Sequence, residues 1–376
     1  MAQVQLQVSE FLTSRIDAGD FPSAVYLVGE RGRVVFTDAL GDAVVQEERI
    51  KATVDTVYDL ASLTKPLVTT FLCAKRIEAG ELSLDDPISL HLVEFDRPDK
   101  RAITLKQLLT HSSGLPGWRP LYVLTGGDRS ATLHAIANEP LDYTPGTQVL
   151  YSDLGFITLG LMLERRAGKT LAELAQQEIF SPLHLEHTWF NPQSTLQAGI
   201  AASELGNAFE RETCEGMKLQ HNSWRQGLVW GEVHDGNCYF LGGEAGHAGL
   251  FSTAAETFQI ANQFIAQRTM LFEPATCRLF QTNFTAGMEE DRSIGWKLAS
   301  SKESSAGPDL PPSSFGHAGF TGTSCWIDGE RERVFILLTN RTHARALPFA
   351  NINEVRRRFH SLAVAALDEQ SVISNQ

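Results

Sequence analysis

The chain has 376 residues, of which 43% are hydrophobic and 20% are charged, and this composition is typical of a globular protein with a large core. The formal net charge of −13 argues against nucleic acid and anionic membrane surfaces as partners, because both are bound mainly through lysine and arginine. A small neutral or cationic ligand is easier to accommodate.

No apolar run approaches the roughly 20 residues that a membrane span requires, and the N-terminus carries neither a basic start nor an apolar signal core. We therefore expect the chain as given to be cytoplasmic, or periplasmic or secreted if a signal peptide has been removed. The five cysteines are scattered without Cys-x-x-Cys spacing, which suits reduced thiols better than a disulfide framework or a zinc knot. The oligomeric state stays open.

The N-terminal third of the chain predicts a helix followed by strands. Apolar residues recur at helical spacing before Gly19 and predict an N-terminal helix. Residues 23–28 and 33–37 are rich in Val, Tyr and Phe and flank a turn at 29–32, so we predict a β-hairpin there.

The middle of the chain, from about residue 80 to 240, shows helix signals and loops with little convincing strand. Thr104 can cap a short helix through Leu109. A longer helix is predicted at about 152–168, and residues 170–173 have the spacing of a capping box for the next one. This region is expected to be mainly helical.

The pattern changes again towards the C-terminus. Residues 253–256 form a second predicted capping box that opens a helix, and the polar stretch 300–314 is predicted to be an exposed loop. The β-rich runs 315–327 and 333–339 are separated by an Asp-Gly pair and predict a second hairpin. A helix at about 352–367 closes the chain.

Strands near both ends of the chain most simply form one antiparallel sheet that helices cover. We therefore predict an α+β fold with two domains. Residues 1–72 and 240–376 would form the domain that contains the sheet, and residues 73–239 an inserted, mainly helical domain. The active site is expected to lie between them.

A candidate nucleophile, Ser62, stands three residues before Lys65 at the start of a predicted helix. Pro66 fits only near a helix start, and three residues are nearly one turn, so both side chains lie on one face. A serine hydroxyl is a weak nucleophile until a neighbouring base takes its proton. Alone, a Ser-x-x-Lys is more often a helix cap followed by a surface lysine, so this prediction depends on further motifs.

Two further motifs stand at wide spacing from the first. Tyr151 and Asp153 come just before the helix predicted at about 152–168, although a tyrosine in such a place is usually a packing residue. The tripeptide His-Ala-Gly occurs at 247–249 and again at 317–319. The first copy runs directly into a predicted helix, whereas the second opens a β-rich stretch whose edge can present backbone N–H groups to a substrate. We therefore select His317.

The Ser-Leu-Thr-Lys of residues 62–65, the Tyr-Ser-Asp of 151–153 and the His-Ala-Gly of 317–319 resemble, in this order, the three motifs of the serine β-lactamase and penicillin-binding protein superfamily. The likeness covers most of the chain and is greatest to the class C β-lactamase and DD-peptidase branch. It implies a serine hydrolase without cofactor or metal that forms an acyl-enzyme on an ester, amide or D-amino-acid peptide. The small-molecule or peptide substrate would be its partner.

The resemblance also implies a role for individual residues. Ser62 would be the acylated nucleophile, Lys65 and Tyr151 would share the proton transfers, and the backbone N–H groups of Ser62 and Phe320 would hold the oxyanion. Further substrate-binding positions implied by the motifs are Asp153, His317 and Gly319. Either Lys65 or Tyr151 can serve as the base, because a closed cleft perturbs the pKa of both.

Two positions depart from the family pattern. Asp153 stands where the family usually has asparagine, so a carboxylate that only accepts hydrogen bonds replaces an amide that can donate. If it faces Lys65, it should keep the lysine charged. His317 stands where β-lactamases carry lysine, whereas peptidases and some esterases of the family share the histidine. Both changes favour hydrolysis of other substrates over efficient β-lactamase activity.

The rival interpretation is a non-catalytic protein of the same fold, either a sensor that stays acylated or a scaffold. The presence of all three motifs argues against a scaffold, because no structural requirement demands them together. Slow turnover stays open, and the rate of deacylation distinguishes a sensor from an enzyme.

Other histidines carry weaker signals. His184 and His187 lie three residues apart without a third metal ligand in the sequence, so we interpret them as surface residues. His234, Asp235 and His247 lie beside the glycine-rich stretch 242–249 and either line the cleft or belong to an ordinary loop. These glycines lack the strand-turn-helix context of a phosphate-binding loop.

Overall fold

The computed structural model describes residues 2–46 and 48–374. Its main feature is a seven-stranded sheet in the order β3-β2-β1-β10-β9-β8-β7, in which all neighbours are antiparallel. The strands are β1 (Ser23–Glu30), β2 (Arg33–Val44), β3 (Ile50–Lys51), β7 (Lys297–Leu298), β8 (Phe315–Ala318), β9 (Ser324–Asp328) and β10 (Arg333–Thr339). Both ends of the chain therefore contribute to one sheet, and the predicted α+β fold is confirmed.

Helices make up most of the remaining ordered structure. They are α1 (Ala2–Asp17), α2 (Phe71–Glu78), α3 (Leu105–Leu109), α4 (Leu121–Leu124), α5 (Thr132–Asn138), α6 (Asp153–Ala167), α7 (Leu171–Ala175), α8 (Ala208–Gly216), α9 (Gly236–Phe240), α10 (Ala254–Asn262) and α11 (Asn353–Ser374). Short 3₁₀ or π segments are η1 (Ala61–Leu63), η2 (Lys65–Thr70), η3 (Ile88–Leu90), η4 (Val93–Phe95), η5 (Arg129–Ala131), η6 (Gln176–Phe180), η7 (Ser194–Gly199) and η8 (Thr276–Phe280).

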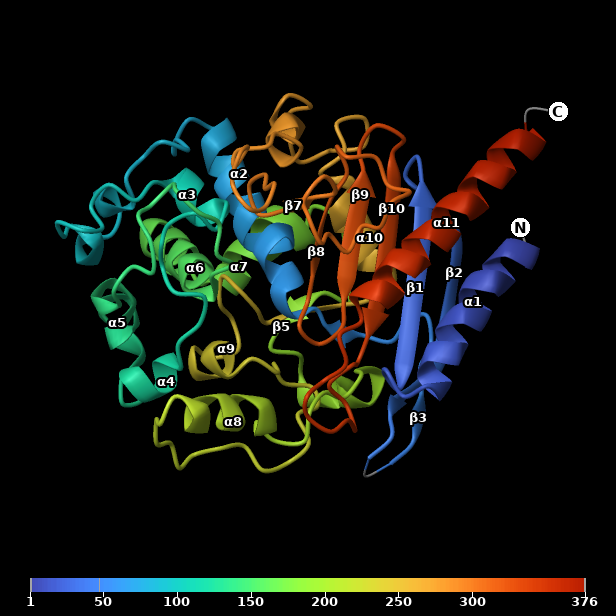
Figure 1. Cartoon of the computed structure of the whole chain (residues 1–376), viewed down its shortest axis with the longest axis horizontal. Helices are drawn as coiled ribbons and strands as arrows, with labels where there is room; N and C mark the ends of the chain where they lie inside the picture. Colours follow the sequence, from blue (N-terminus) through green and yellow to red (C-terminus); the bar gives the residue numbers. More distant parts are fainter. Residues whose placement is uncertain (1, 47, 375–376) are drawn as a thin grey trace.

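The two faces of the sheet are covered by different helices. The terminal helices α1 and α11 lie side by side over one face, and α10 packs on the other (Figure 1). Side chains of β1 alternate accordingly, because successive residues of a strand point to opposite faces. Tyr26 and Val28 pack in the core under α1 and α11, whereas Val25 and Leu27 pack in the larger core on the α10 side.

A second, three-stranded sheet joins the middle of the chain to the nucleophile segment. It consists of β4 (Tyr58–Asp59), β6 (Leu250–Ser252) and β5 (Trp189–Phe190), in the order β4-β6-β5. Strand β6 separates the His-Ala-Gly at 247–249 from α10, so the prediction that this copy runs directly into a helix was wrong. Strands of two or three residues form only when they pair with neighbouring strands, and here those neighbours are distant in sequence.

The helical segment that begins beside Ser62 changes its winding along its length. It starts as the 3₁₀ turn η1, continues as the π-helical segment η2 with Pro66 in its first turn, and becomes α-helical in α2. Gly80 follows with a positive φ of 72°, the left-handed conformation that commonly ends a helix. Three apolar residues of this helical segment are fully buried: Leu63, Leu67 and Phe71.

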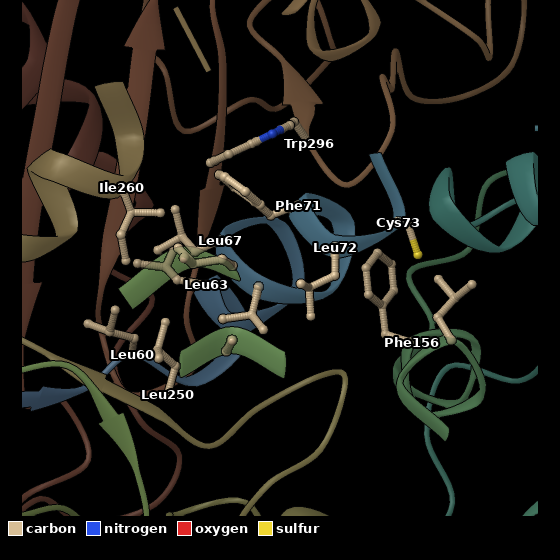
Figure 2. Packing of buried hydrophobic residues seen from close by; sticks show 14 of the residues in the cluster. Leu60, Leu63, Leu67, Phe71, Leu72, Cys73, Phe156, Leu250, Ile260 and Trp296 are labelled. Carbon is tan, nitrogen blue, oxygen red and sulfur yellow. The ribbon is translucent and has the colours of Figure 1, made fainter. Parts of the chain in front are cut away.

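The core around this segment holds it on several sides. Figure 2 shows Leu63 and Leu67 packed between Leu250 and Ile260, with Trp296 above Phe71. Burying side chains of this size stabilises the fold by about 1.5–3 kcal/mol each. The segment that carries Ser62 is thus fixed by the main core.

Most local signals in the sequence are confirmed. The predicted cap at Thr104 forms, as part of a capping box, and so does the predicted capping box at Thr170; Ser152 and Gly168 bound α6. The turn of the first hairpin is tighter than predicted, because β1 continues through Glu30 and leaves residues 31–32 to make the turn.

The predicted capping box at 253–256 forms only in part. The Thr253 side chain accepts from the Glu256 N–H, but the Glu256 carboxylate accepts from the N–H groups of Glu186 and His187 and from the Thr188 hydroxyl. A buried carboxylate with several donors from a distant segment satisfies more polar groups than the local box would. Tertiary contacts therefore override this local signal.

Several other features bear on the predictions from the sequence. Within the described residues, no helix has the length and apolar character needed to cross a membrane. All five cysteines are buried free thiols. The division into residues 1–72 with 240–376 and residues 73–239 stays a prediction.

Candidate active site

Lys65 lies at the centre of a buried polar cluster. Its Nζ donates to Ser62 Oγ at 3.0 Å and to the backbone carbonyl of His247 at 3.0 Å, and it lies 2.7 Å from Asp153 Oδ1. The Lys65 side chain is 0% exposed. A buried ammonium is tolerated only when it is paired and hydrogen-bonded, and Lys65 has two hydrogen bonds and one ion pair. The first two predicted motifs thus meet at one lysine.

Tyr151 forms one wall of this cluster. Lys65 Nζ lies 4.8 Å from the centre of the Tyr151 ring. The ring of His317 lies 5.8 Å from that of Tyr151, and the ring of His111 lies 4.6 Å from it. The structure therefore brings the predicted residues Ser62, Lys65, Tyr151 and His317 together, although they come from three distant segments.

The protonation states follow from burial and neighbouring charges. Burial has the largest single effect and lowers the pKa of Lys65, but Asp153 and Tyr151 together outweigh it and the pKa is raised. Burial raises the pKa of Tyr151, with Lys65 acting in the opposite direction. Burial, together with Lys65 and Arg292, holds the pKa of His317 well below its usual range. At neutral pH the cluster therefore contains an ammonium, a neutral phenol and a neutral imidazole.

A cavity of about 480 Å³ opens above Ser62. Its lining includes the predicted residues Ser62, Tyr151, Asp153, Gly319 and Phe320. The other lining residues are Ala61, Trp118, Phe209, Glu210, Thr213, His234, Asp235, Ala248, Ala318, Arg341, Asn351, Asn353 and Arg356. His317 is absent from this lining and lies behind it, against the Tyr151 ring.

The turn after β8 approaches the nucleophile segment closely. A Cβ on Gly319 would lie 2.1 Å from Thr323 Oγ1 and 2.5 Å from the Leu60 carbonyl oxygen, so no side chain fits there. The Thr323 hydroxyl donates to that same Leu60 carbonyl at 2.9 Å. Glycine at this position thus allows the turn after β8 to pack closely against Leu60 and Ala61, the two residues before Ser62.

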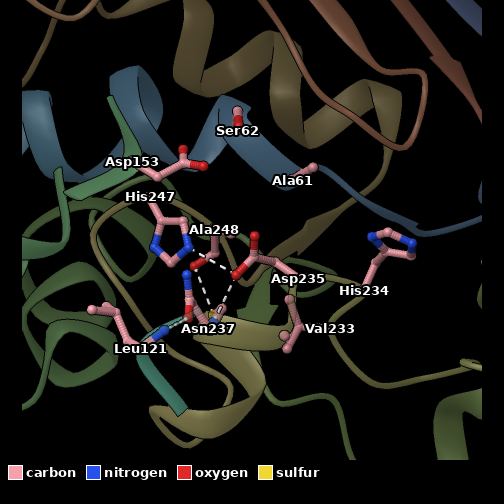
Figure 3. Close-up of polar contacts among 12 residues, drawn as sticks. Ala61, Ser62, Leu121, Asp153, Val233, His234, Asp235, Asn237, His247 and Ala248 are labelled. Atoms are coloured by element: carbon pink, nitrogen blue, oxygen red, sulfur yellow. Dashed lines mark hydrogen bonds and ion pairs between the residues drawn. The ribbon is translucent and has the colours of Figure 1, made fainter. Parts of the chain in front are cut away.

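Asp235 and His247 form a pair beneath the lysine. His247 Nε2 lies 2.8 Å from Asp235 Oδ1, and Figure 3 shows the His247 ring between Asp153 and Asp235. Asp235 also caps α9 by accepting from the Cys238 N–H at 2.7 Å. The sequence left the roles of His234, Asp235 and His247 open. His234 and Asp235 line the cleft, and His247 lies behind Lys65.

The sequence did not single out several charged residues of the cleft. Glu210 is buried, accepts from the Tyr122 hydroxyl at 2.7 Å, and has its pKa raised to about 7 by burial and by Asp235. Arg341 and Arg356 also line the cavity. No local spacing marks these residues, because their contacts join segments far apart in the chain.

No cluster of three or more His, Cys, Asp or Glu side chains suited to a metal ion occurs among the described residues. His184 and His187 are exposed, as their interpretation as surface residues predicted.

Comparison with known proteins agrees with this architecture. Residues 8–356 match the family described as Beta-lactamase. The chain is 31% identical over 368 residues to an Escherichia coli (strain K12) protein named "Putative D-alanyl-D-alanine carboxypeptidase", covering 90% of this chain and 82% of that protein. It is 33% identical over 364 residues to an N-acetylmuramyl-L-alanine amidase of Bacillus subtilis (strain 168), covering 90% and 81%.

Solved structures show the same fold at lower identity. EstCE1, a hydrolase with promiscuous acyltransferase activity, superposes with a TM-score of 0.74 at 20% identity and covers 96% of this chain and 99% of its own. A penicillin-binding protein homologue from Caulobacter crescentus gives 0.73 at 19% identity, covering 96% and 97%. The names of these relatives support a hydrolase-type function. Because the family match spans nearly the whole chain and agrees with the three motifs, the chain belongs to the β-lactamase family, within the superfamily of serine β-lactamases and penicillin-binding proteins.

Proposed function

We propose that this protein is a serine hydrolase that forms an acyl-enzyme on Ser62 and hydrolyses an ester, an amide or a D-amino-acid peptide. The observation that carries the proposal is the 3.0 Å contact between Lys65 Nζ and Ser62 Oγ at the floor of an open cavity. Acyl transfer requires a nucleophile within hydrogen-bond reach of a proton acceptor and two donors where the tetrahedral oxygen will form.

The charges of the site divide the proton transfers between two residues. Asp153 keeps Lys65 as an ammonium, so Lys65 acts mainly as a fixed positive charge beside Ser62. Tyr151 would then accept the serine proton in its phenolate form, which is a minor form at neutral pH because burial raises the pKa of Tyr151, although the adjacent Lys65 ammonium opposes that rise. The same proton passes to the leaving group, and the reverse sequence with water releases the acyl group.

The backbone N–H groups of Ser62 and Phe320 would hold the oxyanion. Ser62 and Phe320 both line the cavity, and Gly319 allows the two backbone segments to approach each other. Two preformed donors at this place are worth several kcal/mol in the transition state, about 2.7–4 kcal/mol for each. No metal or cofactor enters this mechanism.

The substrate class is inferred from the site and from the relatives. His317 is held neutral and lies behind the cavity lining, so it provides no fixed positive charge for a β-lactam carboxylate. Relatives are named as a putative D-alanyl-D-alanine carboxypeptidase and an N-acetylmuramyl-L-alanine amidase, and a structural neighbour is a hydrolase with promiscuous acyltransferase activity. We therefore place peptides and esters ahead of β-lactams as substrates, and a periplasmic location would suit a cell-wall peptide.

Intact-protein mass spectrometry after treatment with a fluorophosphonate, a penicillin and a short acyl ester tests the proposal. One adduct is expected for the wild type and none for Ser62→Ala. Ser113→Ala is the control, because Ser113 is a buried serine that lies outside the cavity lining. Absence of any Ser62-dependent adduct with all three probes would contradict the proposal.

The lifetime of the acyl adduct separates the enzyme from the sensor. Loss of the short acyl group within the time of a turnover assay supports a hydrolase. A stable adduct with every ester and D-alanyl peptide tried would instead support a protein that signals while acylated.

A further inference from the structure

The peptide bond between Gly319 and Phe320 is held from behind by a buried arginine. Arg356, in the first turn of α11, donates from Nη2 to the Gly319 carbonyl at 3.1 Å and to the Thr323 carbonyl at 3.1 Å. Its Nη1 donates to Asn353 Oδ1 at 2.9 Å. Arg356 is 6% exposed. The Arg356 side chain therefore bonds to neutral oxygens only: two backbone carbonyls of the turn that follows β8, and the amide oxygen of Asn353 in the same helix.

The Gly319 carbonyl and the Phe320 N–H belong to one peptide unit. A trans peptide is planar, so its C=O and N–H groups point in opposite directions. A donor fixed on the carbonyl therefore fixes the direction of the N–H. A charged donor on the carbonyl also polarises the peptide and makes its N–H a stronger donor, because linked hydrogen bonds strengthen one another by about 10–30%.

From this geometry we infer that Arg356 is a positioning residue that orients and polarises the Gly319–Phe320 peptide so that the Phe320 N–H stabilises the oxyanion. The inference rests on the proposed acyl-enzyme mechanism and concerns a residue that touches neither Ser62 nor Lys65. Arg356 also lines the cavity, and the inference concerns its action through the peptide unit.

The other expected oxyanion donor has an equivalent support. The Ser62 N–H belongs to the same peptide unit as the Ala61 carbonyl, and that carbonyl accepts from the hydroxyl of Thr64 at 2.7 Å. Thr64 is fully buried. Both peptide units that would hold the oxyanion are thus anchored at their carbonyl oxygens, one by the hydroxyl and N–H of Thr64 and one by the Arg356 guanidinium and the Gly322 N–H at 3.1 Å. The contribution that is specific to Arg356 is therefore its charge.

The charge of Arg356 has no other evident use in the fold. It forms no ion pair within the described part of the chain. Burial lowers its pKa to about 9, so it stays protonated at neutral pH. An unpaired buried cation costs stability, and such a cost is common where a charge serves a site. The contact with the Gly319 carbonyl places the Arg356 charge on the oxyanion peptide, where it would strengthen the Phe320 N–H as a donor.

Arg341 offers a matched comparison in the same cleft. Its Nε and Nη2 donate to the Phe320 carbonyl at 3.0 and 2.7 Å. That carbonyl belongs to the next peptide unit, whose N–H is that of Thr321. Loss of Arg341 should loosen the turn without removing the charge from the oxyanion peptide.

The test measures the rate of Ser62 acylation by p-nitrophenyl acetate, an ester without a carboxylate, by stopped-flow in Arg356→Met, Arg356→Lys and Arg341→Met. Arg356→Met should lower the acylation rate constant about 10- to 100-fold, somewhat less than removal of a whole oxyanion donor, with little change in ester binding. Arg356→Lys should recover part of the rate, and Arg341→Met should cost less. Arg357→Met, on the same helix but outside the cavity lining, should equal wild type.

Infrared difference spectra of the acyl-enzyme give a second readout that general loosening would not reproduce. Weaker hydrogen bonding to the acyl carbonyl in Arg356→Met or Arg356→Lys should move its stretch to higher wavenumber. If Arg356→Met fails to fold, Arg356→Lys decides the matter by the same two measurements.

Three results would overturn the inference. They are a wild-type acylation rate and carbonyl frequency in the Arg356 variants, an effect confined to substrates that carry a carboxylate, and an equal loss in Arg341→Met. Absence of Ser62 acylation in the wild type would overturn both this inference and the proposed function, whereas normal acylation with unaffected Arg356 variants would leave the proposed function intact.

Discussion

Asp153 Oδ1 lies 2.7 Å from the Nζ of Lys65, so the carboxylate that replaces the usual asparagine of the second motif is an ion-pair partner of the lysine beside Ser62. The Lys65 side chain is fully buried, whereas Asp153 also lines the cavity. The pair therefore links the charge state of the lysine to a residue that a substrate can contact. This relationship departs from the family pattern and determines how the site should respond to pH.

Asp153→Asn should move the acidic limb of the pH–rate profile to lower pH. Asp153 raises the pKa of both Lys65 and Tyr151, so its loss lowers both, whichever of them is the base. An opposite charge at this distance changes a pKa by about 1–3 units, and we expect the acidic limb of the kcat/KM profile to move by about 1 pH unit. The two groups titrate jointly, so the limb belongs to the pair.

The same variant should change substrate preference. The amide restores a donor towards the substrate, so acylation by a β-lactam should hold or rise while ester or peptide turnover falls. Asp96→Asn, at an exposed position, is the control. An unchanged profile and an unchanged preference would mean that Asp153 only interacts with the dipole of α6.

Asp235→Asn should have a smaller effect of the same sign. Burial would raise the pKa of Asp235, but His247 outweighs it and the pKa lies below its usual range. The amide keeps the cap of α9 while removing a negative charge that attracts Lys65. We expect the acidic limb to move to lower pH by less than in Asp153→Asn.

Asp235→Ala is the paired variant, because it removes the cap as well and should lower the free energy of unfolding by about 1–2 kcal/mol. Urea unfolding separates the two effects. A larger pH shift in Asp235→Asn than in Asp153→Asn would contradict the assignment of Asp153 as the dominant anion.

Gly246→Ala should damage both stability and turnover. A Cβ at Gly246 would lie 2.0 Å from the backbone oxygen of Phe156, and this backbone contact cannot relax as a side chain would. The next residue, His247, supplies the carbonyl that holds Lys65. We expect a loss of about 1–3 kcal/mol in the free energy of unfolding and a fall in kcat.

The control for Gly246→Ala is Gly199→Ala, where a Cβ would meet nothing within 4 Å. Chemical denaturation and ester turnover of both variants check the prediction. Equal stability of the two variants would show that α6 and the 245–249 loop can move apart.

His360 should make stability fall as the pH is lowered. Burial lowers its pKa from 6.5 to about 3, and its Nδ1 lies 3.0 Å from the Ser305 carbonyl. Between these two values the unfolded chain binds a proton that the folded chain does not, so the free energy of unfolding decreases with falling pH. Between pH 7 and 5 this one group accounts for a loss of about 2 kcal/mol.

His360→Gln should therefore lose less stability than the wild type between pH 7 and pH 5, even if it is less stable at pH 7. Urea unfolding at both pH values measures the difference. His134→Gln, at an exposed position, should keep the wild-type slope. Parallel wild-type and His360→Gln dependences would show that His360 accepts a proton in the folded state.

Local interactions explain why much of the fold could be predicted. The caps at Thr104 and Thr170 bond to residues three positions away, and the alternation of β1 needs only the strand itself. The three motifs likewise depend on spacings within one turn or one strand edge. These features were predictable because each side chain and its partner are neighbours along the chain.

Contacts between segments that are distant in sequence could be identified only from the folded structure. Glu256 gives up its local cap for the backbone at 186–187, the His247 carbonyl holds Lys65, and Arg356 reaches the Gly319 carbonyl. Each of these contacts joins residues that no sequence period or spacing relates. A buried polar group forms its hydrogen bond with whichever partner the fold brings within about 3 Å. The sequence alone thus predicted the family and the α+β fold, which are confirmed, and the candidate residues for chemistry, which stay a prediction. The tertiary structure decided the charge around Lys65 and the contacts of the Gly319–Phe320 peptide, because burial and long-range pairing set both.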